Sequence, residues 1–310
     1  MTNISPESPE ERRKHPEAHR DDWRSSRAWV IAKRVAVGVY SEGFIHAGNL
    51  AYLSLLTLFP FLIVAAAIAR IFGQRGAGIR TVDALLDTMP PNVAEVLQGP
   101  LTDVLMARSG NLLWLGALVG LWTTGSFIET IRDIIRRAYG VGYNRPFWEY
   151  RLASAAIIVA SVVIAMMAFS ASVVLSSVQQ FAVTWIPGAD RVVRLMTLFQ
   201  FVPGLMLFGS LYLIFLSLTP KRYRGSDCLK WPGPAFVTLW WLGTTALLPQ
   251  VLGTLGGYDL TYGSLAGVMI ALIFFFVIGL GLVIGAHLNA ALAEVPESEP
   301  GHRMEAEEGK

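Results

Sequence analysis

Apolar residues gather into long runs along the chain, and shorter polar stretches separate them. The runs cover about residues 44–71, 111–128, 152–178, 193–218, 234–255 and 262–290. A helix needs about 20 predominantly apolar residues to cross the hydrocarbon core of a bilayer, and each run is near that length or longer. The pattern therefore predicts an all-α polytopic membrane protein with six transmembrane helices.

Two of the predicted spans contain a proline. Pro60 lies in the first span and Pro203 in the fourth. Proline has no backbone N–H to bond to the carbonyl one turn earlier, and its ring crowds that carbonyl. We therefore expect both helices to be kinked at these positions, as membrane helices tolerate.

The segment 73–110, between the first two spans, is too polar to cross a bilayer. Apolar residues nevertheless recur at helical spacing on both sides of Pro90 and Pro91. Such spacing is typical of amphipathic helices. We expect two short amphipathic helices, broken at the prolines, that pack on the outer face of the bundle or lie among the lipid headgroups.

The two ends of the chain differ from the middle in composition. Residues 1–22 are rich in Pro, Glu, Arg and Ser, and the tail 294–310 is acidic. Segments that are poor in apolar residues and rich in charge are typically disordered. We therefore predict a disordered arm over 1–22, a single membrane domain over 23–293 and a disordered tail over 294–310.

The distribution of lysine and arginine predicts the orientation in the membrane. With the N-terminus inside, the inner segments collect the basic arm, the group around Arg132 to Arg151 and the group around Lys221 to Lys230. Segments on the cytoplasmic side of a membrane are enriched in these residues. An even number of spans then places both termini in the cytoplasm.

Composition agrees with a membrane protein and gives no sign of an enzyme. Charged residues make up 15% of the chain, against about a quarter in soluble proteins. Cys228 is the single cysteine, and the five histidines form no His-x-His cluster. The chain also lacks a nucleophile elbow and a phosphate-binding glycine loop. We expect no catalytic activity, cofactor or metal, and lipids rather than nucleic acid as partners of the basic segments.

Polar residues inside the predicted spans are the candidates for function, because ionisable groups there are costly. Glu42, His46 and Asn49 are spaced so that they share one face of the first helix, and that face continues to Pro60. The spacing predicts a polar stripe that begins near the cytoplasmic boundary.

The last span brings two further polar residues to the same depth. It runs in the opposite direction, so His287 and Asn289 also lie near the cytoplasmic boundary. We expect these residues to meet Glu42, His46 and Asn49 in a polar path. The alternative is that each side chain reaches the interface on its own or caps a helix end.

Arg132, Arg136 and Arg137 follow the second span closely. Basic residues at the inner membrane surface are attracted to anionic lipid headgroups. The sequence therefore predicts that these arginines form a basic patch that faces lipid.

Several motifs resemble those of one family. The stretch "AGNLAYLSLLTLFP" resembles the first-helix signature of the YihY/BrkB family of bacterial inner-membrane proteins, which were formerly labelled ribonuclease BN-like. "YNRPFWEYRL" and "TYGSLAGVMIALIFFFVIGLGLVIGAHLNAAL" resemble two further stretches of that family. The resemblance covers about residues 36–292 and implies an inner-membrane protein. His287 stands where the family usually has a glutamate, so a role of that acid does not carry over directly.

Two functions remain open from the sequence. The polar stripe beside the prolines favours a protein that handles or transports an amphiphile, a lipid or a small solute without ATP hydrolysis. The absence of an acidic residue deep in a span favours a structural or scaffolding membrane protein without a substrate, because coupled carriers usually need such a residue. A homo-oligomer is compatible with either function.

The predicted topology can be tested by labelling single cysteines on a Cys228-free background. Cysteines at Ser5 and Ser298 should react only from the cytoplasm, and one at Asp259 only from outside. The physical reason is that a hydrophilic maleimide does not cross the bilayer. Reaction of position 298 from outside would rule out the six-span arrangement.

Overall fold

The structure, a computed structural model, describes most of the chain and is all α. Its described residues are 5–15, 26–71, 83, 86, 87, 89–107, 111–142, 148–160, 163, 202–225, 228–254 and 265–293, and no strand occurs among them. The longer elements are α2 (Arg27–Gly38), α3 (Phe44–Ile71), α5 (Pro91–Ala107), α6 (Asn111–Tyr139), α9 (Val202–Leu218), α10 (Pro232–Thr254) and α12 (Ala266–Leu292). Shorter ones are α1 (Pro9–Lys14), the π-helical turn η2 (Val39–Gly43) and the 3₁₀ turn η4 (Lys221–Tyr223). A further helix covers 148–160.

Three of the described helices are long and apolar enough to cross a membrane. These segments are Phe44–Phe61 within α3, Pro232–Thr254 and Ala266–Leu292, and α9 contributes a shorter apolar stretch, Gly204–Leu218. Most of the predicted third span, and the beginning of the fourth, lie outside the described residues. The fold is thus a helical membrane bundle, and the number of six spans stays a prediction.

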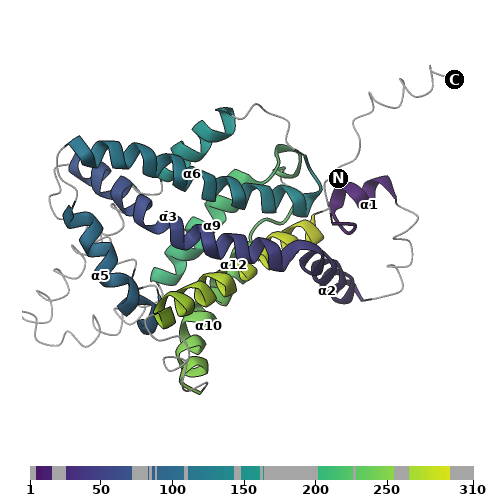
Figure 1. Cartoon of the computed structure of the whole chain (residues 1–310). Coiled ribbons are helices and arrows are strands. Elements are labelled where there is room, and N and C mark those ends of the chain that lie inside the picture. The colour runs from purple at the N-terminus through teal and green to yellow at the C-terminus, as the bar shows by residue number, and fades with distance from the viewer. Residues whose placement is uncertain are drawn as a thin grey trace, which may run out of the picture.

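Helix α12 lies in the middle of this bundle (Figure 1). It packs against α3 and α10 along much of its length, and also contacts α2, α5 and α6. A helix that is apolar on all sides is expected to be buried, and α12 buries residues from Ala266 to Ala291.

Glycines allow the neighbouring helices to approach α12 closely. A Cβ atom on Gly281 would overlap the Trp240 ring of α10, and one on Gly285 would lie 2.9 Å from the carbonyl oxygen of Gly233. The Trp240 indole N–H donates to the carbonyl of Val277, at 2.8 Å. Small residues at such contacts are typical of membrane helices, whose association depends on close packing.

The two predicted kink positions differ in their surroundings. Helix α3 continues through Pro60, whose carbonyl faces Gly120 of α6. Pro203 is the second residue of α9, in a first turn where proline is well tolerated. The residues before α9 lie outside the described part of the chain, so a kink at Pro203 stays a prediction, as does the kink at Pro60.

The segment between the first two predicted spans is described mainly by α5. This helix begins at Pro91 and buries Val93, Leu97 and Leu101. These side chains belong to one apolar cluster with residues of α3, α10 and α12, such as Leu58 and Phe274. The part that precedes Pro90 lies largely outside the described residues.

The prediction of a disordered arm over 1–22 is wrong for residues 5–15. These residues include helix α1. The backbone N–H of Glu11, in its first turn, donates to the hydroxyl of Ser8. Ser8 and Glu10 are buried against the bundle. Composition failed here because Glu10 and Arg12 bond to groups of the bundle, at Arg222, Tyr223 and the end of α12. The remaining residues of the arm, and the tail 294–310, lie outside the described residues.

The contact between Gly120 and Pro60 predicts a clear effect of an added methyl group. In Gly120→Ala the new Cβ would lie 2.6 Å from a backbone carbonyl oxygen, which cannot move aside easily. We expect the free energy of unfolding to fall by about 1–3 kcal/mol, as for other overpacked interiors. Thermal unfolding in detergent, followed by tryptophan fluorescence, measures it.

Gly243→Ala is the matched control for this prediction. No atom lies within 4 Å of the Cβ position at Gly243 of α10. Alanine is the better helix former, so this variant should unfold at the wild-type temperature or slightly above. Equal behaviour of the two variants would contradict the tight α3–α6 contact.

Candidate functional site

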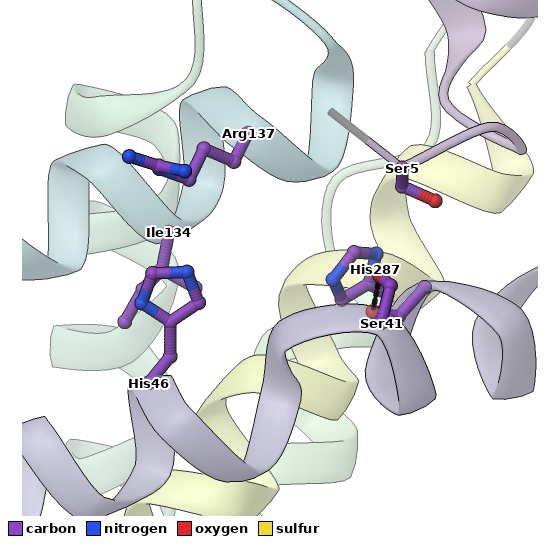
Figure 2. Close-up of a pocket in the computed structure, with 7 residues that line it drawn as sticks. Ser5, Ser41, His46, Ile134, Arg137 and His287 are labelled. Atoms are coloured by element: carbon purple, nitrogen blue, oxygen red, sulfur yellow. Dashed lines mark hydrogen bonds between the residues drawn. The ribbon is translucent and has the colours of Figure 1, made fainter. Parts of the chain in front are cut away.

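A small polar pocket lies at the end of the bundle where α12 terminates. Residues of the N-terminal arm, α2, η2, α3, α6 and α12 line it, namely Ser5, Gly38, Ser41, His46, Ile134, Arg137 and His287. Figure 2 shows His46 beside Ile134 and Arg137, and His287 beside Ser41. The enclosed space has room for little more than a water molecule.

The structure brings two of the predicted site residues, His46 and His287, to this one pocket. They come from α3 and α12, which are far apart in the sequence. The ring of His287 lies so close to Gly38 of α2 that a Cβ atom there would overlap it. A neutral imidazole has one nitrogen that donates and one that accepts a hydrogen bond, and both donate when the ring is charged. The two histidines therefore supply the pocket with hydrogen-bond donors and acceptors.

Asn49 does not join this pocket, and the prediction for it is wrong. The inward face of α3 is formed by residues such as Ala47 and Leu50, which are buried. His46 lies at the edge of that face, whereas Asn49 lies beyond it and is exposed. Glu42 belongs to the π-helical turn η2, and its side chain lies outside the described part of the structure.

Asn289 does not join the pocket either, because it faces α10. Its side chain is 1% exposed. The Oδ1 atom accepts a hydrogen bond from the backbone N–H of Gly233 at 2.7 Å, and the Nδ2 atom donates to the carbonyl of Lys230 at 2.9 Å. Residues two apart point to nearly opposite sides of a helix, so His287 and Asn289 cannot serve one site. Asn289 instead binds the start of α10.

The prediction of a lipid-facing arginine patch is wrong for Arg132, which is only 5% exposed. Its guanidinium donates to the carbonyl of Tyr150 at 3.3 Å and to the hydroxyl of Ser154 at 3.1 Å. Arg136 bonds to the carbonyl of Gly142 and lies 5.7 Å from the centre of the Tyr150 ring. Arg137 pairs with Asp133 at 2.7 Å and reaches the pocket.

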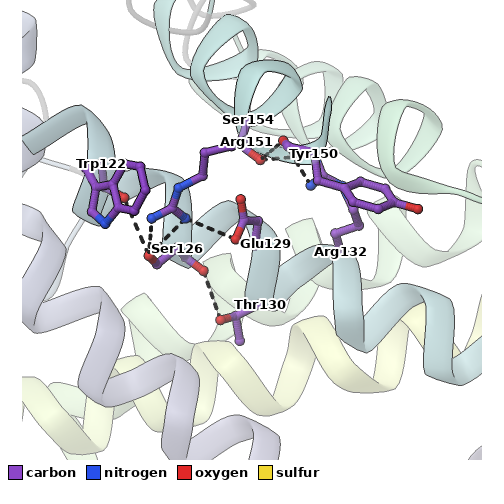
Figure 3. Close-up of polar contacts among 8 residues, drawn as sticks. All are labelled: Trp122, Ser126, Glu129, Thr130, Arg132, Tyr150, Arg151 and Ser154. Atoms are coloured by element: carbon purple, nitrogen blue, oxygen red, sulfur yellow. Dashed lines mark hydrogen bonds and ion pairs between the residues drawn. The ribbon is translucent and has the colours of Figure 1, made fainter. Parts of the chain in front are cut away.

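A second polar cluster, which the sequence analysis did not select, surrounds Arg151 (Figure 3). Arg151 forms an ion pair with Glu129 at 3.0 Å and donates to the Ser126 hydroxyl at 3.1 Å. The guanidinium carbon lies 4.1 Å from the centre of the Trp122 ring, a cation–π contact. Trp122, Ser126 and Glu129 are spaced four and three residues apart on α6, so their shared face was a signal in the sequence.

These polar groups connect helices rather than form a metal centre. Among the residues that the structure describes, no group of three or more His, Cys, Asp or Glu side chains could hold a metal ion. Arg132 and Arg151 together attach α6 to the helix over 148–160. The arrangement offers charged and titratable groups inside the bundle, which mark functional positions in membrane proteins by default.

Fold and site together define a helical membrane protein with a polar interior at one end of the bundle. Comparison with known families places the chain more closely: it belongs to the family described as virulence factor BrkB, which matches residues 41–310. No solved structure matches the chain.

Two relatives match most of the chain. The chain is 27% identical to a ribonuclease-like protein, YfkH, of Bacillus subtilis over 268 residues, which cover 84% of this chain and 95% of the relative. It is 28% identical to a UPF0761 membrane protein of Verminephrobacter eiseniae over 264 residues, or 80% of this chain and 59% of the relative.

The different positions of the two asparagines predict different effects on stability. Asn289→Ala leaves the buried N–H of Gly233 without its acceptor, which should lower the free energy of unfolding by about 1–3 kcal/mol. Asn49→Ala, a matched change at an exposed position, should leave it nearly unchanged. Thermal unfolding of the two variants in detergent compares them directly. A loss at Asn49 as large as that at Asn289 would contradict their described positions.

Proposed function

We propose that the protein handles or transports an amphiphile, a lipid or a small solute across the bacterial inner membrane, without hydrolysing ATP and without enzymatic activity. In this proposal the chain has six spans, both termini lie in the cytoplasm, and the pocket opens toward the cytoplasm. The observation that carries the proposal is that His46 and His287, from two different candidate spans, line one pocket together with Arg137.

The chemistry of the pocket suits the polar part of a membrane amphiphile. Arg137 supplies a guanidinium, and the two imidazoles and Ser41 supply donors and acceptors. Arginine binds phosphate and carboxylate groups in a fixed geometry. An anionic or zwitterionic headgroup could thus exchange its hydration shell for these groups while its tails stay beside the apolar outer faces of α3 and α6.

The outer faces of the same helices are suited to lipid. Ile45, Tyr52 and Leu56 of α3 and Leu115 and Leu118 of α6 are exposed. Large exposed apolar surfaces mark interaction sites or membrane contacts. Of these residues, Ile45 is next to His46, so a lipid that lies against this end of α3 would be close to the pocket.

A structural role without a substrate is the second candidate. The small volume of the pocket favours it, since the described form has room for little more than a water molecule. In that case the buried arginines and Asn289 only hold helices together, and the protein shapes or organises the membrane. The two candidates differ in one observable, namely protein-dependent movement of a substrate.

Transport can be tested with purified protein in liposomes. A fluorescently labelled phosphatidylethanolamine probes lipid movement, because dithionite in the outer solution quenches only molecules that reach the outer leaflet. Trapped carboxyfluorescein probes the passage of a small anion. We expect protein-dependent movement of one probe without ATP, and slower movement in His46→Ala and His287→Ala.

The variants also test whether the two histidines act as one site. Residues that act together are not additive, so the double variant should be little slower than either single variant. Asn49→Ala, which lies outside the pocket, serves as the control and should move the probe at the wild-type rate. Movement of neither probe above the rate of protein-free vesicles would favour the structural role instead.

A further inference from the structure

The N-terminal arm, residues 5–15, lies across the end of the bundle that holds the pocket. Figure 1 shows α1 beside α2 and the end of α12. Ser5 of the arm supplies one wall of the pocket, opposite residues of α3 and α6. The arm is therefore part of the boundary between the pocket and the outside.

Glu10 is the central contact of the arm. Its side chain is only 10% exposed and pairs with Arg222, with 3.2 Å between Oε1 and Nη1. The phenol of Tyr223 donates to the same Oε1 atom at 2.8 Å. Burial, and then this hydrogen bond, raise the pKa of Tyr223 above its usual range, so the phenol remains a donor. Hydrogen bonds to charged groups are the stronger ones.

Arg12 provides a second attachment, at the end of α12. Its Nη2 atom donates to the carbonyls of Ala290 and Ala293, at 3.1 and 3.3 Å. The last carbonyls of a helix lack intrahelical partners, and a cation there is favoured by the helix dipole. Arg12 thus completes the C-terminus of the helix that carries His287.

The arm contacts Gly140, directly after the end of α6. Gly140 has a φ of 76°, in the left-handed region that favours glycine. A Cβ atom there would lie 3.0 Å from the Cβ of Glu10 and would also overlap the Ser8 hydroxyl. The absence of a side chain at Gly140 lets the arm lie directly on the bundle.

We propose that this arm is a reversible strap, which closes the pocket when docked and opens it to the aqueous phase when released. A helix of six residues is not stable alone, so α1 is held by its contacts with the bundle. The attachments described above are ionic and polar, and the Arg222 side chain is 39% exposed, so a competing charge in solution can reach this end of the ion pair. The consequence for transport rests on the proposed function, whereas the closure itself does not.

Cysteine accessibility tests the closure in lipid nanodiscs, where both membrane faces are open to reagent. Cys228→Ala removes the native thiol, and Ile134→Cys places a reporter in the pocket at a position that is 1% exposed. Glu10→Arg should repel Arg222 and release the arm. We expect maleimide labelling of this reporter to become about tenfold faster, in line with the loss of a charged hydrogen bond.

Two controls separate release of the strap from general loosening. Ile158→Cys is a matched reporter, equally buried at 1% but outside the pocket lining, and its labelling should not change. The charge exchange Glu10→Arg with Arg222→Glu should restore slow labelling at position 134. Failure of the exchange to do so would overturn the assignment of the attachment to this pair.

Two results would overturn the strap as a whole. One is wild-type labelling at position 134 both in Glu10→Arg and in a variant that lacks residues 5–15. The other is an equal acceleration at positions 134 and 158, which would show that the arm stabilises the entire bundle. Because the labelling requires no transported substrate, it can support the strap even if the liposome assay shows no movement.

Discussion

The close packing of helices around α12 is the constraint on which the rest of the structure depends. Lipid tails are as apolar as leucine, so helices in a bilayer gain little from burying apolar surface and associate through close contact and internal hydrogen bonds. Gly281 and Gly285 let α10 approach α12, and Gly38 lets α2 approach the ring of His287. The glycines on α12 thus fix the position of α10, and Gly38 lets α2 come near enough to line the pocket beside His287.

Buried polar groups provide the second kind of connection between helices, and they serve stability and the site at once. Asn289 fixes the start of α10, while Arg132 and Arg151 attach α6 to the helix over 148–160. Each of these groups has partners on a neighbouring element, as groups in an apolar medium require. His46 and His287, from α3 and α12, line one pocket together, and this makes the pocket the candidate for function.

The sequence predicted the elements better than the faces that they present. The bounds of α3, Phe44–Ile71, follow directly from its apolar run, and the matched depth of His46 and His287 followed from the opposite directions of their helices. The roles of Asn49, Arg132 and the arm could not be read locally. Each depends on which residues another segment brings near: the inward face of α3 is set by α12, and the partners of Arg132 and Glu10 lie in 148–160 and η4.

The strap and the pocket are separable along the chain. The match to the family covers residues 41–310, which include His46, Ile134, Arg137 and His287 but not the arm. The surfaces that receive the arm, at Arg222, Tyr223 and the end of α12, do lie within the matched residues. The bundle can therefore supply both the pocket and the docking contacts, while closure depends on a short segment outside the matched region. In the proposed strap, a short segment held by ionic and polar contacts controls access to the pocket, and access can change without repacking the helices around α12.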